Sequence, residues 1–153
     1  MPRASTFASH AIYVIASLAL AVLPAGAQEA VKAAPAPSTA LVLELNAAQP
    51  SDKGCRLTFV VTNNLGAELT KAAFEIALFN GAGVVDRLTV LDFNELPAGK
   101  TKVVRFDLSG TDCTKISRVL VNHATECTGA GIDPKACLGQ LKPETKSTIV
   151  FGV

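Results

Sequence analysis

Tryptophan is absent from the chain, and tyrosine, methionine and histidine are nearly so. The one Tyr, the one Met and one of the two His lie before residue 28, in a segment that we expect to be removed. Sugar-binding sandwiches stack their ligands on flat Trp or Tyr side chains, and copper handling needs clusters of Met and His. These absences argue against both functions.

An excess of charge of either sign is also lacking. The 153 residues hold 14 Lys and Arg against 13 Asp and Glu, which gives a formal net charge of +1. Nucleic-acid binding needs a basic face, so we expect no nucleic-acid partner. The length and the 49% hydrophobic content suit one folded domain.

Motifs for catalysis and for metal binding are missing as well. The chain has no G-x-S-x-G, no C-x-x-C and no D-x-D-x-D pattern. His123 is the one candidate base after residue 27, and a nucleophilic mechanism needs more than a base. We predict that the protein is not an enzyme and holds no cofactor or metal. A metal-handling or enzymatic role centred on His123 is the weaker alternative.

Residues 1–27 have the pattern of a secretory signal peptide. Arg3 precedes an apolar run over Ile12–Leu23, and a small-residue A-G-A triplet ends at Ala27. We therefore expect cleavage between Ala27 and Gln28. The run is shorter than the ~20 residues that cross a bilayer, so no membrane anchor is expected after cleavage. The predicted location is the periplasm or the exterior, reached by general secretion because twin arginines are absent.

The remaining chain divides into a linker and a β domain. Residues 28–39 are rich in Ala and Pro and predict an extended linker. From residue 40 onward apolar residues alternate with polar ones, which is typical of strands with one buried face. Residues 40–153 therefore predict an immunoglobulin-like antiparallel β-sandwich of about seven strands, with an open barrel as the alternative. The expected strands lie at 41–45, 55–62, 74–78, 84–93, 102–108, 116–122 and 148–153.

The four cysteines are even in number and belong to a chain expected to be exported, so we predict two disulfides. If consecutive strands alternate in direction, Cys55 and Cys113 lie at one end of the sandwich and Cys127 and Cys137 at the other. A disulfide joins Cα atoms that are only about 4.4–6.8 Å apart. We therefore predict the pairs Cys55–Cys113 and Cys127–Cys137. A zinc site would need closely spaced ligand pairs, and the cysteine spacing does not provide them.

Residues 124–146 form the longest expected connection between strands. Plain loops rarely exceed ~12–15 residues, and this segment would be stapled by the predicted Cys127–Cys137 bond. Residues 135–141 are expected to form a short helical turn within it. A stapled loop loses little entropy on docking, so both a recognition surface and a lid over one end of the sandwich stay open as interpretations.

Most of residues 41–137 resemble a group of small exported proteobacterial proteins of uncharacterised function, often labelled only by their Tat or secretory signal sequence. The resemblance rests on four segments, CRLTFVVTNNLGAEL, FEIALFNGAGVV, LPAGKTKVVRFDLSGTDC and ISRVLVNHATEC. It implies an immunoglobulin-like β-sandwich and brings no catalytic motif. The chain departs from the twin-arginine label of that group.

These observations predict a non-enzymatic exported binding or assembly module, whose partner is an unknown periplasmic protein and for which segment 124–146 is a candidate recognition surface. A structural accessory that pairs a strand edge with an envelope component is the alternative.

Overall fold

The computed structural model describes residues 39–153, which form eight strands and two short helices. The expected signal peptide, its cleavage position between Ala27 and Gln28, and the linker up to residue 38 lie outside the described residues. No helix within residues 39–153 has the length and apolarity needed to cross a membrane. The elements are β1 Leu41–Ser51, β2 Gly54–Asn63, β3 Leu69–Phe79, β4 Val85–Leu96, β5 Thr101–Ser109, η1 Cys113–Lys115 (a 3-10 turn), β6 Arg118–Thr128, α1 Ala136–Gly139, β7 Leu141–Thr145 and β8 Val150–Gly152.

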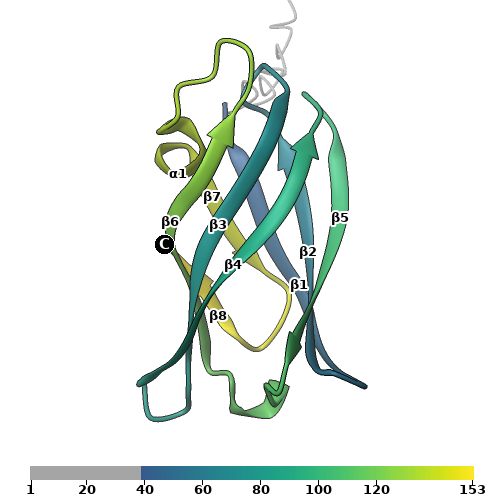
Figure 1. The fold of residues 1–153 in the computed structure, drawn as a ribbon, viewed down its shortest axis with the longest axis vertical. Coiled ribbons are helices and arrows are strands. Elements are labelled where there is room, and N and C mark those ends of the chain that lie inside the picture. The colour runs from purple at the N-terminus through teal and green to yellow at the C-terminus, as the bar shows by residue number, and fades with distance from the viewer. Residues whose placement is uncertain (1–38) are drawn as a thin grey trace, which may run out of the picture. The chain divides into compact units, whose positions relative to one another are not determined.

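The strands form two four-stranded sheets that pack against each other (Figure 1). One sheet has the strand order β5-β2-β1-β7, and the other has the order β4-β3-β6-β8. The predicted all-β sandwich is therefore confirmed, and the barrel alternative is not the observed fold.

Alternating apolar residues supply the core between the sheets. Leu57, Phe59 and Val61 of β2 are almost fully buried, as the period of two predicts. The Phe59 ring makes edge-to-face contacts with Phe93 of β4 and Phe151 of β8, with ring centroids 5.6 and 5.7 Å apart. Such pairs contribute about 0.5–1.5 kcal/mol beyond the burial of their area. The scarce aromatic residues therefore hold the two sheets together.

A buried amide fixes the turn after β2. The Asn63 side chain is fully buried, and its Nδ2 donates to the carbonyl oxygens of Ala67 (2.9 Å) and Leu96 (2.8 Å). Its Oδ1 accepts from the backbone N–H of Leu65 at 3.0 Å. Because these hydrogen bonds use both ends of the amide, they offset the cost of burying it. Asn63 thus ties this turn to the end of β4.

The C-terminal segment crosses from one sheet to the other, and its pairings are parallel. β7 pairs with β1 only along Leu41–Leu45, and β8 pairs with β6 only along Arg118–Leu120. Parallel pairs were not expected from an antiparallel sandwich. The crossing leaves the second half of β1 without β7 as a neighbour, and most of β6 without β8 as a neighbour.

The expectation of an unbroken loop over residues 124–146 is wrong. β6 continues to Thr128, and β7 begins at Leu141, so only residues 129–140 connect the two strands. β7 is difficult to recognise in the sequence because Pro143 lies at its centre between charged residues. Proline lacks a backbone N–H and is tolerated on an edge strand, and β7 is the edge strand of its sheet.

Candidate functional site

All four cysteines form the predicted disulfides. Cys55 at the start of β2 is bonded to Cys113 in η1, with a Cα–Cα distance of 4.9 Å. Cys127 near the end of β6 is bonded to Cys137 in α1, with a Cα–Cα distance of 5.8 Å. The two bonds lie at opposite ends of the sandwich, as the alternation of strand directions predicts.

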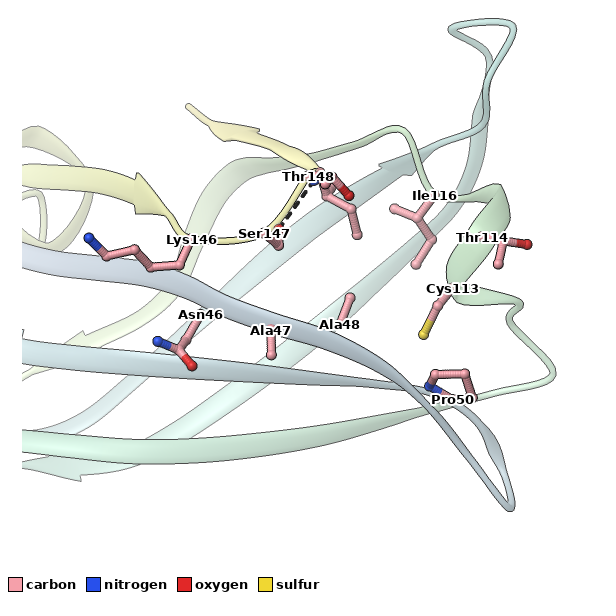
Figure 2. A pocket seen from close by; sticks show the side chains of 11 residues that line it. Asn46, Ala47, Ala48, Pro50, Cys113, Thr114, Ile116, Lys146, Ser147 and Thr148 are labelled. Atoms are coloured by element: carbon pink, nitrogen blue, oxygen red, sulfur yellow. Dashed lines mark hydrogen bonds between the residues drawn. The ribbon is translucent and has the colours of Figure 1, made fainter.

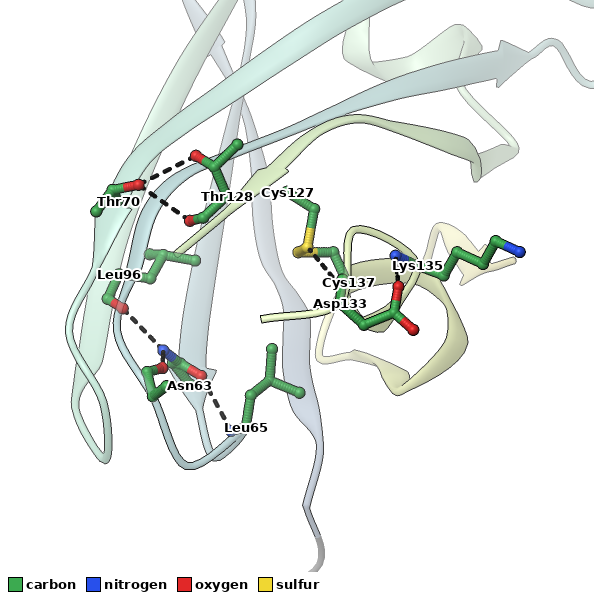
Figure 3. Close-up of a disulfide and its surroundings, with 10 residues drawn as sticks. Asn63, Leu65, Thr70, Leu96, Cys127, Thr128, Asp133, Lys135 and Cys137 are labelled. Carbon is green, nitrogen blue, oxygen red and sulfur yellow. Dashed lines mark hydrogen bonds between the residues drawn. A yellow bond between two sulfur atoms is a disulfide. The ribbon is translucent and has the colours of Figure 1, made fainter. Parts of the chain in front are cut away.

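The stapled segment, residues 129–140, is a compact turn that ends in α1. The Asp133 carboxylate accepts from the backbone N–H of Lys135 at 2.9 Å (Figure 3). The backbone N–H of Ala136 donates to the Asp133 carbonyl at 2.8 Å. The helical turn expected at residues 135–141 is therefore present as α1, at Ala136–Gly139. Its recognition role stays a prediction.

His123 lies on β6 with half of its side chain exposed. Its Nδ1 is 3.4 Å from Oε1 of Glu75, and the same oxygen accepts a hydrogen bond from Asn122 Nδ2 at 2.6 Å. The described residues contain no group of three or more His, Cys, Asp or Glu side chains that could hold a metal ion. The contacts of His123 are those of a strand residue in a surface polar cluster.

Two strands have an edge that the crossing segment leaves uncovered. We call Asn46–Ser51 the β1 half-edge, because β7 stops beside Leu45. We call 121–128 the β6 half-edge, because β8 pairs with β6 only as far as Leu120. Uncovered strand edges are sites where another chain can pair.

An open groove of about 500 Å³ lies beside the β1 half-edge. Figure 2 shows the connection from Lys146 to Thr148 turning away from β1, with η1 on the far side. Ala48, Ile116 and Ile149 line the interior, and both isoleucines are nearly buried. Asn46, Thr114, Lys146, Ser147 and Thr148 contribute polar groups around it. The groove thus combines an apolar interior with polar walls.

The β1 half-edge presents backbone groups toward this groove. Leu41 N–H donates to the Gln140 carbonyl, and the Leu45 carbonyl accepts from Lys146 N–H, both at 3.0 Å. Inward-facing residues of β1 therefore direct their peptide groups toward β7. Ala48 also packs against the core, so its N–H and C=O point to the same side. On that side of Ala48 the described residues place no strand, because the pairing of β7 with β1 ends at Leu45.

Two features restrict what can pair at the β1 half-edge. The β1–β2 register shifts between Leu45 and Ala47, which makes Asn46 a bulge residue, and Pro50 has no backbone N–H. Bulges and prolines limit pairing along sheet edges. The half-edge therefore fits one short extended segment centred on Ala48.

The η1 turn that forms the far wall of the groove is held in place by two kinds of bond. The Asp112 carboxylate accepts hydrogen bonds from Thr114 N–H at 2.9 Å and from Thr114 Oγ1 at 2.7 Å. These bonds lower the pKa of Asp112 below its usual value of 3.8. The next residue, Cys113, is bonded to Cys55. Bonds within the protein therefore hold this wall of the groove in place.

The β6 half-edge has a different neighbour. α1 lies beside the upper part of β6 (Figure 1), where the Cys127–Cys137 bond attaches it. Between them is a cavity of about 390 Å³, lined by His123, Ala124, Pro134, Lys135, Leu138 and Gly139. The stapled segment therefore lies over part of this edge.

Sequence patterns do not identify the groove, because its walls come from three separate segments around residues 46–50, 113–116 and 146–149. Pro50 is the one local signal, since proline within a strand indicates an edge or a bulge.

Comparisons with known proteins give little further information. No protein-family model matches the chain, and no curated protein matches it. Among solved structures, the chain is similar to the trimeric lipoprotein SadB of Salmonella enterica, with 20% sequence identity and a TM-score of 0.40. The match covers 46% of this chain and 40% of the SadB chain. A likeness this low carries no argument about fold or function.

Proposed function

We propose that residues 40–153 form a non-enzymatic periplasmic module that binds or assembles with another protein, with the β1 half-edge as the first candidate surface. The open β1 half-edge is the observation that supports this function most directly. The two disulfides support an extracytoplasmic location, because such bonds persist in oxidising compartments. A half-edge fixed in a stapled sandwich loses little conformational freedom on binding.

The chemistry of the groove favours binding over catalysis. A nucleophilic mechanism needs a nucleophile beside a base. Cys113 in the groove lining is oxidised, and Lys146 is the titratable side chain there. His123 lines the other cavity, next to α1.

The stapled segment is the second candidate binding surface. The cavity between β6 and α1 is lined largely by apolar groups, among them Ala124, Pro134 and Leu138. A protein side chain could dock there without strand pairing.

Site-specific photo-crosslinking tests the proposed function. The exported chain would carry a photoreactive amino acid at Thr148 in the groove, at Ala130 in the stapled segment, or at Ala82. Ala82 is exposed in the turn between β3 and β4, outside both surfaces, and serves as the control. We expect one envelope protein, identified by mass spectrometry, to crosslink at Thr148 or Ala130 and not at Ala82.

The absence of adducts at both test positions in the native cells would contradict a binding or assembly role. A His123→Ala chain that loses a bound metal or an activity would instead support the alternative centred on that residue.

A further inference from the structure

Among residues 39–153, no strand lies beside the β1 half-edge, along the line in which β7 would continue. The last backbone bond in that line runs from Lys146 N–H to the Leu45 carbonyl. After Lys146 the chain turns away from β1 toward β8. The N–H and C=O of Ala48 and the C=O of Pro50 lie farther along the same edge of β1. One extended segment can use these groups in the way that β7 uses those of Leu41–Leu45.

The side chains around the β1 half-edge indicate which kind of extended segment can bind there. In an added strand, alternate side chains would face inward, between Ala48, Ile116 and Ile149, so an apolar side chain fits there. Lys146 directly follows the last residue of β7. Its side chain is 67% exposed, and its Nζ lies 4.0 Å from Glu44 Oε2. A contact this long and exposed leaves the ammonium group able to attract a second carboxylate.

We propose that the groove binds an extended peptide segment of a partner protein as an added strand beside Ala48, with an apolar side chain between Ile116 and Ile149 and a carboxylate near Lys146. This proposal rests on the proposed binding function and names the site and the chemistry of the partner. Backbone groups that have no partner among the described residues, together with the charge of Lys146, select an acidic extended peptide as the occupant.

A random linear heptapeptide library displayed on phage is the probe, with the exported, disulfide-bonded chain as the target. We expect the selected peptides to combine an apolar residue with Asp or Glu. Ala48→Pro should weaken their binding about ten-fold or more, because it removes the N–H donor that the added strand needs. Peptides that bind this variant and the unaltered chain equally would overturn the proposal, as would a selection that yields no peptide.

A second variant keeps the test valid if Ala48→Pro disturbs the fold. Thr148 is exposed on the groove wall, so Thr148→Trp should fill the groove and abolish peptide binding. Thr125→Trp is the matched control, because Thr125 is an exposed threonine on β6, away from the groove. Equal loss of binding in both Trp variants would contradict the assigned site.

Charge reversal tests the carboxylate. Lys146→Glu should weaken peptide binding by about two- to five-fold, the range of an exposed ion pair. A peptide with Lys in place of its acidic residue should recover that loss. Failure of the swapped peptide to recover binding would remove Lys146 from the proposed site.

Hydrogen exchange distinguishes the other occupants. The Ala48 amide of the free chain should exchange quickly and become protected when a selected peptide is added. Protection without peptide would mean that a second copy, or residues 28–38, already occupies the edge, and would overturn the partner-peptide proposal. Crosslinks at Ala130 alone would preserve the proposed function and refute this site, whereas crosslinks at neither position would refute both.

Discussion

The two half-edges of the sandwich have the same origin and opposite surroundings. Both exist because the C-terminal segment pairs briefly with β1 and then crosses to β6. Over the β6 half-edge the chain places α1 and attaches it with the Cys127–Cys137 bond. Over the β1 half-edge it places a groove, whose far wall is fixed by the Cys55–Cys113 bond.

This difference concerns how each edge is protected. An uncovered edge is an aggregation hazard unless a helix, a proline or a bulge limits it. The β6 half-edge has the helix and two register shifts against β3, whereas the β1 half-edge has Pro50 and the bulge at Asn46. One disulfide therefore attaches α1 beside the β6 half-edge, whereas the other fixes a wall of the groove and leaves the β1 half-edge accessible.

Removing each disulfide should have the largest effects and should separate the two roles. The Cys55–Cys113 bond closes a loop with a sequence separation of 58, and the Cys127–Cys137 bond one of 10. Loop-closure entropy predicts losses of about 4 and about 3 kcal/mol in the free energy of unfolding. Denaturant titration of the Cys55→Ala/Cys113→Ala and Cys127→Ala/Cys137→Ala chains measures both.

Hydrogen exchange on the Cys127→Ala/Cys137→Ala chain tests whether this bond acts on the β6 half-edge alone. Without the Cys127–Cys137 bond, the amides of residues 122–126 should lose protection while those of the β1 half-edge stay unchanged. Equal loss of protection at both half-edges would show that the bond stabilises the whole sandwich and does not specifically cover β6.

Proline substitutions at neighbouring residues test which side of β1 is free. Ala47 lies opposite Thr58 and directs its peptide group to β2, so Ala47→Pro removes a ladder bond and should cost about 1–3 kcal/mol. Ala48 directs its N–H to the groove, so Ala48→Pro should change the free energy of unfolding by about 0.5 kcal/mol or less. Similar losses for both variants, measured by thermal unfolding, would place the Ala48 N–H inside the sheet.

The sequence predicts one of these half-edges better than the other. Alternating residues such as Leu57 and Phe59 identify the strands that form the sandwich, and alternating strand directions place Cys127 near Cys137. The bond that covers β6 is therefore predictable. The groove is not, because it depends on where β7 ends, and Pro143 obscures β7 itself.

A glycine substitution should loosen the cover of β6 with a smaller effect. A Cβ on Gly129 would clash with the backbone oxygen of Glu68, so the stapled segment must shift to accept Gly129→Ala. We expect a loss of about 1–2 kcal/mol. Gly139→Ala in α1 is the control, since its Cβ would meet nothing within 4 Å. Circular dichroism melts that do not distinguish the two variants would contradict this close approach.

The smallest effect concerns the wall of the β1 groove and depends on pH. Hydrogen bonds from Thr114 lower the pKa of Asp112 below 3.8 in the folded chain, so the folded state favours the charged carboxylate. The stabilisation is present above pH 3.8 and is lost as the pH falls through the lowered pKa. Asp112→Asn should therefore remove part of the acid dependence of stability below pH 4 and leave its dependence between pH 6 and 8 unchanged. Identical acid-unfolding curves for the two chains would mean that this cap does not hold the groove wall, and that the Cys55–Cys113 bond does so alone.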